Sequence, residues 1–326
     1  MSAPETTGRG ADGDGLRGRV VLVTGSGNGL GAWIARAAAR HQARVVVNCR
    51  RDERRAGNLC AELQKTGGEV LACRADVTAF GEAQALVEEV LKAFGRIDVL
   101  VNTVGVFAWK PVAELEPAEW RAMMASNLDS VYNMSRLVIP HMRRNHFGRI
   151  VNLGAVGAER TVGHPKVSAY SAAKAAVIAF SKALALEEAR CGITVNVVSP
   201  GVLVDGEESA HALDHSADRI PVGRRGSPED VVRAVLFFCS PAAGGSSFDV
   251  PLPRTSRREN AKAAANGAQF FRRQCSVRVA ERALRRLAAD ALRRETLTNG
   301  GAERSAPHSR LKLRPPRRAT CAPDRR

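Results

Sequence analysis

The sequence predicts an α/β fold: a single domain built on a Rossmann-type, doubly wound parallel sheet in three layers. Short apolar runs alternate with stretches of helical composition between Arg19 and Ala243. The runs are almost continuously apolar, which is typical of strands buried on both faces of a parallel sheet. The first run ends in a glycine-rich turn that opens a helix, and sheets of this kind bind ligands at the carboxyl ends of their strands.

The expected elements follow one another regularly along the chain. Strands are expected at 20–23, 45–47, 70–72, 99–101, 150–153 and 193–197. Helices are expected at 33–41, through Leu59 and Leu63 up to Gly67, and at 81–94, 117–144 and 169–189. A helix between successive strands is the connection that parallel pairing requires.

The positive charge of the chain is concentrated near its C-terminal end. The 326 residues hold 49 Lys plus Arg and 33 Asp plus Glu, a net +16, of which residues 244–326 supply +13. That segment has no Ile, Tyr or Trp, and 18 of its 20 cations are Arg. We therefore expect a flexible leader over 1–17, a folded domain over 18–243, and a disordered Arg-rich tail over 244–326. Within the tail, 277–297 could form a helix.

Composition excludes several classes of protein. A hydrophobic share of 44% is too high for a mainly disordered chain. No apolar run reaches the ~18 residues of a membrane span, and no apolar stretch near the start predicts a secretory signal. The seven cysteines form no CxxC pair and no metal-ligand spacing. They predict reduced thiols in a cytoplasmic protein without a metal site.

The glycine-rich turn reads TGSGNGLG from Thr24 to Gly31. Glycines let the backbone turn tightly and approach a pyrophosphate, whose charge is met by the amides at the helix start. Because this turn follows a strand and opens a helix, it favours a dinucleotide site over a purely structural turn.

The end of the second strand bears on the choice of cofactor. An acid there would bind the adenosine ribose, whereas an arginine would pair with a 2′-phosphate. The sequence has Arg50 and no acid before it, which favours NADP(H) over NAD. The alternative is that Arg50 and Arg51 belong to the solvated face of the next helix.

Tyr170 and Lys174 lie four residues apart on an expected helix, so they share a face with Cβ atoms about 5–6 Å apart. A lysine ammonium near a phenol stabilises the phenolate and lowers a pKa that starts near 10. A tyrosine in this setting can serve as acid and base for a carbonyl oxygen.

Over about residues 17–243 the chain resembles the short-chain dehydrogenase/reductase family, most closely its 3-oxoacyl-(acyl-carrier-protein) reductase branch. The matching motifs, in family order and spacing, are the glycine-rich turn, Asp76-Val77, Asn102-Thr103-Val104-Gly105, Asn127, Tyr170-Ser171-Ala172-Ala173-Lys174 and Pro200-Gly201. The resemblance implies an NADP(H)-dependent oxidoreductase that reduces the carbonyl of a small molecule or an acyl thioester. It also implies a homo-oligomer, a tetramer or a dimer, assembled through 117–144 and 169–189.

The resemblance implies a role for each matching residue. Tyr170 would donate or take the substrate proton, Lys174 would bind the nicotinamide ribose and assist it, and Asn127 would hold a water in the proton relay. The expected cofactor-binding residues are Gly25, Ser26, Asn28, Gly29, Leu30, Gly31, Arg50, Asp76, Val77, Asn102, Gly105, Tyr170, Lys174, Pro200 and Gly201.

Three positions depart from the family pattern. Ala155 stands where the family has a serine that bonds the carbonyl oxygen, and losing such a donor typically costs about 10²–10³ in rate. Asp205 replaces a threonine near the cofactor. The last strand of the family is expected to be missing, because 246–250 is a poor replacement. These departures support an alternative: a catalytically impaired, nucleotide-binding homologue.

The tail has three interpretations. Its Arg, Ala and Pro content favours a frame-shifted or otherwise replaced end, because the family pattern stops near Gly244. A functional basic extension could contact nucleic acid through phosphates, but it offers few aromatic side chains for stacking. Nucleic acid is therefore not an expected partner, and neither is a membrane. The third interpretation is an unspecialised disordered tail.

Overall fold

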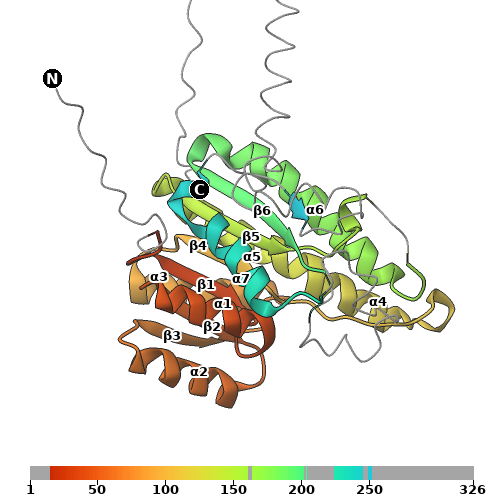
Figure 1. Cartoon of the computed structure of the whole chain (residues 1–326), viewed down its shortest axis with the longest axis horizontal. Coiled ribbons are helices and arrows are strands. Elements are labelled where there is room, and N and C mark those ends of the chain that lie inside the picture. The colour runs from red at the N-terminus through yellow and green to blue at the C-terminus, as the bar shows by residue number, and fades with distance from the viewer. Residues whose placement is uncertain (1–14, 161–163, 202, 204–223, 245–248, 252–326) are drawn as a thin grey trace, which may run out of the picture. The chain divides into compact units, whose positions relative to one another are not determined.

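The computed structural model describes residues 15–160, 164–201, 203, 224–244 and 249–251 (Figure 1). Most of the expected leader, the Arg-rich tail from residue 252 with its expected helix, Asp205 and most of the loop that follows Gly201 lie outside the described residues.

Within the described residues, a parallel sheet has the strand order β3-β2-β1-β4-β5-β6-β7 (Figure 1). The strands are β1 Val20–Thr24, β2 Arg44–Cys49, β3 Val70–Arg74, β4 Val99–Asn102, β5 Gly148–Leu153, β6 Ile193–Ser199 and β7 Asp249–Pro251. The chain proceeds outward from β1 in one direction to β3 and then in the other from β4. The ends of β1 and β4 therefore form the switch point at which such sheets bind ligands.

Helices cover both faces of the sheet. They are α1 Gly29–Arg40, α2 Glu53–Lys65, α3 Phe80–Phe94, α4 Pro117–Met124, α5 Ser130–Arg144, α6 Ser168–Glu188 and α7 Pro228–Cys239. Short turns are η1 Val112–Glu114, η2 Ala125–Asp129, η3 Ala158–Arg160, η4 Ala189–Cys191 and η7 Pro241–Ala243. The doubly wound, three-layer α/β fold expected from the sequence is confirmed.

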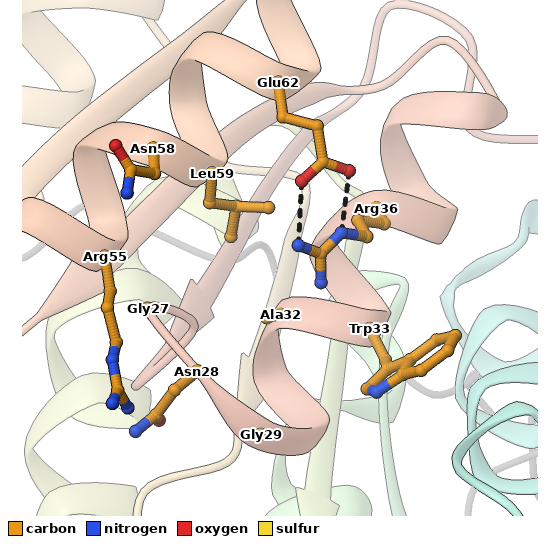
Figure 2. A pocket seen from close by; sticks show the side chains of 10 residues that line it. All are labelled: Gly27, Asn28, Gly29, Ala32, Trp33, Arg36, Arg55, Asn58, Leu59 and Glu62. Atoms are coloured by element: carbon orange, nitrogen blue, oxygen red, sulfur yellow. Dashed lines mark hydrogen bonds and ion pairs between the residues drawn. The ribbon is translucent and has the colours of Figure 1, made fainter.

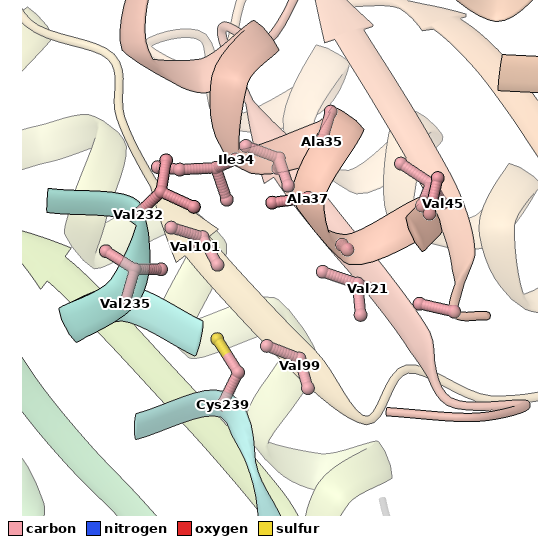
Figure 3. Close-up of a cluster of buried hydrophobic side chains, with 14 of the residues drawn as sticks. Val21, Ile34, Ala35, Ala37, Val45, Val99, Val101, Val232, Val235 and Cys239 are labelled. Atoms are coloured by element: carbon pink, nitrogen blue, oxygen red, sulfur yellow. The ribbon is translucent and has the colours of Figure 1, made fainter. Parts of the chain in front are cut away.

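Alternate residues of each strand face the two helical layers. Val21 and Val23 pack in one cluster with residues of α1, α2 and α7. Figure 3 shows part of this cluster, including Val21 together with Ile34 of α1 and Val235 of α7. Val20 and Leu22 pack with α3, α5 and α6 on the other face. Each such side chain contributes roughly 1.5–3 kcal/mol when fully buried, so the apolar runs stabilise both layers.

Several helix ends are fixed by local side chains. The Asp52 carboxylate accepts a hydrogen bond of 2.9 Å from the Arg55 amide at the start of α2. Ser227 and Asp230 form a reciprocal capping box at the start of α7. α3 ends at Gly95, whose φ of 72° is the left-handed conformation that glycine adopts most easily.

The expectation that the last strand is missing is wrong. Asp249–Pro251 forms β7, which pairs in parallel with Val197–Ser199 of β6. Strands pair through hydrogen bonds between backbone groups, so three extended residues can add to the edge of the sheet without an apolar run.

Leu16, which falls within the expected leader, is only 3% exposed and packs in the first core cluster.

The helix expected over 117–144 is interrupted by the π-helical turn η2 between α4 and α5.

Among the described residues, the segment Ser168–Cys191 is long and apolar enough to cross a membrane by length and composition alone. It packs against β6 and supplies a buried face to the sheet, as expected of a core helix in a globular protein.

Candidate active site

The glycine-rich turn is shaped by close contacts with the loop after β4. A Cβ atom on Gly25 would lie 2.9 Å from Val104 Cγ2, and one on Gly31 would lie 2.7 Å from Thr103 Oγ1. Gly25 and Gly29 have φ values of 64° and 52°, which favour glycine. The first amides of α1 have no partner within the helix, so they are available for a phosphate at this edge.

Asn48 holds the turn in place, a role that the sequence analysis did not foresee. Its Oδ1 atom accepts a hydrogen bond of 3.0 Å from the Gly25 amide, and its Nδ2 atom donates to the Ala75 carbonyl at 3.1 Å. Its own amide donates to Ser26 Oγ at 3.1 Å. The signal in the sequence is a polar residue near the end of an otherwise apolar strand.

Asn102 ends β4 in a buried polar chain. Its Nδ2 atom donates to Asn152 Oδ1 at 2.8 Å, and Asn152 in turn donates to Ser181 Oγ on α6 at 2.8 Å. Asn102 Oδ1 is buried and has no partner among the described residues. Asn152 and Ser181 therefore join the candidate site through their contact with Asn102, although no motif pointed to them.

Asn127 lies in the middle of η2 and is fully buried. Its Nδ2 atom donates to the carbonyl oxygens of Val106 at 2.9 Å and Met123 at 3.0 Å. Its Oδ1 atom has no partner among the described residues and faces Gly105, where a Cβ atom would lie 2.4 Å away. π-helical turns are frequent at functional sites because they redirect side chains within a helix.

Tyr170 and Lys174 share one face of α6. The Nζ atom of Lys174 lies 5.6 Å from the centre of the Tyr170 ring and donates to the Leu153 carbonyl at 2.8 Å. Lys174 is 5% exposed, whereas Tyr170 is half-buried. A phenol and a held ammonium can together transfer a proton to or from a carbonyl oxygen.

The segment after β5 reaches the same edge of the sheet. Ala155 packs against an apolar cluster formed by Ala158, Ile178 and Val197. The Val156 amide donates to the Pro200 carbonyl at 3.3 Å, so Pro200 lies beside this segment; Gly201 is exposed.

Arg50, Asp76 and Val77 gather at the ends of β2 and β3. Arg50 Nη1 lies 3.3 Å from Asp76 Oδ2 in a partly exposed ion pair. Burial alone would raise the pKa of Asp76, but hydrogen bonds from Thr78 and Arg50 hold it below its usual value. The Val77 side chain is buried in the second core cluster, and its carbonyl accepts from Asn133 at 3.1 Å.

A pocket of about 310 Å³ lies between α1 and α2, next to the glycine-rich turn. It is lined by Gly27, Asn28, Gly29, Ala32, Trp33, Arg36, Arg55, Asn58, Leu59 and Glu62. Figure 2 shows Arg55 pointing toward Asn28, while Arg36 and Glu62 form a paired contact of 2.8 Å at each of two oxygens. No sequence motif points to Arg55, because its side chain reaches Asn28 only when α2 packs beside the glycine-rich turn.

Contacts thus connect expected site residues along the carboxyl edge of the sheet. The turn contacts the Asn102–Gly105 segment, which contacts Asn127, and Lys174 binds the end of β5. Arg50 and Asp76 lie at the outer end, toward β3. Close glycine contacts and the two unpartnered amide oxygens fit an extended dinucleotide along this edge.

Comparison with known proteins identifies the family of the chain. The model of the short chain dehydrogenase family matches residues 19–211. A 3-oxoacyl-(acyl-carrier-protein) reductase from Haemophilus influenzae is 38% identical over 238 residues, covering 70% of this chain and 93% of its own.

Two solved structures have the same fold. A gluconate 5-dehydrogenase from Burkholderia cenocepacia, in complex with NADP and tartrate, is 31% identical with a TM-score of 0.67 and covers 73% of this chain and 95% of its own. A 7α-hydroxysteroid dehydrogenase, complexed with NADH and 7-oxo glycochenodeoxycholic acid, is 30% identical with a TM-score of 0.68 and covers 73% and 93%. The chain therefore belongs to the short-chain dehydrogenase/reductase family, in its 3-oxoacyl-(acyl-carrier-protein) reductase-like branch.

Proposed function

We propose that the protein is an NADP(H)-dependent oxidoreductase that reduces the carbonyl of a 3-oxoacyl thioester or a similar ketone to a secondary alcohol. The observation that carries the proposal is the pair of Tyr170 and Lys174, with the ammonium 5.6 Å from the centre of the phenol ring. Carbonyl and alcohol oxidoreduction is also what the names of its relatives describe.

The chain's own residues supply the proton chemistry. When bound, the nicotinamide cofactor supplies the hydride that reaches the carbonyl carbon. The Tyr170 phenol donates a proton to the carbonyl oxygen, and the nearby Lys174 ammonium stabilises the phenolate that remains. Asn127 Oδ1 is an acceptor that can hold a water, and this water can pass a proton from the solvent to the phenolate while it receives another in exchange.

The preference for NADP(H) rests on basic side chains near the turn. Residues 50–55 contain four arginines and two acids, and Arg55 lines the pocket beside Asn28. We propose that Arg50 and Arg55 both contact the 2′-phosphate, because guanidinium groups bind phosphate oxygens in pairs. Arg50 would then exchange its contact with Asp76 for one with the phosphate.

Ala155 favours a second candidate function, a nucleotide-binding homologue with little turnover. Its methyl group packs against apolar side chains and offers no hydrogen bond to a carbonyl oxygen. Loss of one such donor typically lowers the rate about 10²–10³-fold, which would leave binding largely intact.

Turnover and binding separate the two candidates. The purified protein is expected to oxidise NADPH with an acetoacetyl thioester, and Tyr170→Phe is expected to abolish turnover while NADPH still binds. NADPH binding without turnover in the unmodified protein would favour the second candidate. In that case Ala155→Ser should raise turnover at least tenfold, whereas Ala172→Ser, at an exposed position of α6, should not.

We also propose that the enzyme is a cytoplasmic homo-oligomer assembled through α5 and α6. Tyr132 on α5 is 46% exposed and Leu186 on α6 is 72% exposed, which supports an apolar contact there. Light scattering coupled to gel filtration should give a mass of a dimer or tetramer, and a monomer would contradict the proposal.

A further inference from the structure

Two aromatic side chains lie in the segment that follows β4, and one of them contacts Tyr170. The Phe107 ring lies 5.0 Å from the Tyr170 ring, centre to centre, at an interplanar angle of 81°. The Trp109 ring lies 6.3 Å from that of Phe107, with the two planes tilted by 38°. Both side chains are half-buried, so part of each is accessible. We call Phe107 and Trp109 the aromatic wall.

The aromatic wall is held at both ends. On its N-terminal side, the Val106 carbonyl accepts from Asn127 Nδ2 at 2.9 Å, and the Val106 amide donates to Ser126 Oγ at 3.2 Å. On its C-terminal side, the Lys110 amide donates to the Lys166 carbonyl at 2.7 Å, just before α6. The backbone that carries the wall is thus joined on one side to Asn127 and on the other to the residue two positions before α6, which keeps this segment beside Tyr170.

The surface of this segment is apolar. Val106, directly before the wall, is 42% exposed, and the residue between Phe107 and Trp109 in the sequence is Ala108. The nearest charge in the segment, Lys110, forms an ion pair of 2.7 Å with Glu119. A hydroxyl-rich substrate would lose hydrogen bonds to water against such a surface and gain none in return.

A substrate with a flat ring gains more binding affinity from the aromatic wall than a substrate without one. Aromatic pairs prefer offset or edge-to-face contacts at ring separations of 4.5–7 Å, and each pair contributes about 2- to 12-fold in affinity beyond the apolar area buried. A flexible acyl chain can bury apolar area against the wall, but it has no ring to form an aromatic contact. Binding also orders the chain, which costs conformational entropy.

From this geometry we infer that the aromatic wall makes an aromatic or fused-ring ketone, with its flat apolar body, a better substrate than a keto-sugar or an acyl thioester, which the enzyme still reduces but less efficiently. The inference rests on the proposed function and names its substrate class. Phe107 and Trp109 are then specificity-determining residues, because they bind the ring body of the substrate while Tyr170 donates a proton to its carbonyl oxygen.

Matched ketones test the inference with the full-length protein and NADPH. The ring ketone β-tetralone is expected to have a kcat/KM at least tenfold above that of an acetoacetyl thioester and of a keto-sugar acid. Trp109→Leu is expected to raise the KM for β-tetralone about five- to tenfold with little change in kcat. The same variant should change the KM for the acetoacetyl thioester by less than twofold.

A control and a binding measurement complete the design. Phe237→Leu changes an aromatic residue on α7 that is 37% exposed, and it should leave all three substrates unchanged. β-Tetralone should quench tryptophan fluorescence in the unmodified protein and much less in Trp109→Leu.

The failures of the two proposals are distinguishable. If the protein reduces the thioester but shows no preference for β-tetralone, the inference is wrong and the proposed function stands. The same holds if Trp109→Leu lowers kcat/KM equally for every substrate. Absence of turnover with every ketone would overturn both.

Discussion

Lys174 Nζ donates a hydrogen bond of 2.8 Å to the carbonyl oxygen of Leu153, joining α6 to the carboxyl end of β5. A buried ammonium is costly unless it is hydrogen-bonded, so this carbonyl fixes where the charge lies relative to Tyr170. The bond also explains why a lysine can be 5% exposed in a core helix.

Removing the charge of Lys174 should abolish most activity without unfolding the protein. Lys174→Met keeps the aliphatic stem but loses the ammonium, so we expect kcat for ketone reduction to fall about 10²–10⁴-fold. Steady-state kinetics and thermal melting measure the two effects. Lys182→Met, at an exposed position of the same helix, is the control and should keep both values. Equal kcat values for the two variants would contradict the role of Lys174.

Gly105 should tolerate no side chain because of its contact with Asn127. In Gly105→Ala the new Cβ would lie 2.4 Å from Asn127 Oδ1, so the amide must move away from its position. We expect kcat to fall at least tenfold and the free energy of unfolding to fall by about 1–3 kcal/mol. Gly81→Ala, where a Cβ atom meets nothing within 4 Å, should keep kcat and should not lower the free energy of unfolding, because alanine favours a helix more than glycine does. A fully active Gly105→Ala would show that the position of Asn127 is not critical.

Asn48 should couple stability to cofactor binding. Asn48→Ala leaves the Gly25 amide and the Ala75 carbonyl without their partner, which we expect to lower the free energy of unfolding by about 1–3 kcal/mol. The affinity for NADPH should fall as well, because the turn loses its anchor. Denaturant unfolding and a fluorescence titration measure the two effects. Asn145→Ala, on an exposed residue, provides the comparison, and an unchanged NADPH affinity in Asn48→Ala would refute the coupling.

Asp230 should make stability depend on pH at acid values. A hydrogen bond from Arg224 holds the pKa of Asp230 well below its usual value, against the effect of burial. A group whose pKa is depressed on folding stabilises the protein above its unfolded pKa of about 3.9, and this stabilisation is lost as the pH falls through the folded value. Asp230→Asn should therefore lower the Tm by roughly 2–4 °C near pH 7, and by less as the pH falls below about 4.

Melting curves across this pH range test the prediction for Asp230. Glu229→Gln, its exposed neighbour in the first turn of α7, is the control and should show little change in Tm. A difference between Asp230→Asn and the unmodified protein that persists undiminished at the lowest pH would show that shape, and not charge, is responsible.

Periodicity and local motifs predicted most of the architecture. The apolar runs marked β1 to β6, because strands of a parallel sheet are buried on both faces and are therefore mostly apolar. The same reasoning failed at Asp249–Pro251, because an edge strand is defined by backbone pairing with β6 and needs no apolar run. It also missed η2, because a single π-helical turn leaves the helical pattern of 117–144 almost unchanged.

The doubly wound sheet, the glycine-rich turn and the four-residue spacing of Tyr170 and Lys174 can be read from the amino-acid order, because each depends on residues close together in the chain. Three contacts became visible only in the folded protein: Asn48 anchors the turn, Asn102 is linked through Asn152 to Ser181, and the ring of Phe107 meets that of Tyr170. These contacts join residues that are far apart in sequence, and their geometry exists only once the strands have been ordered and the helices packed on them.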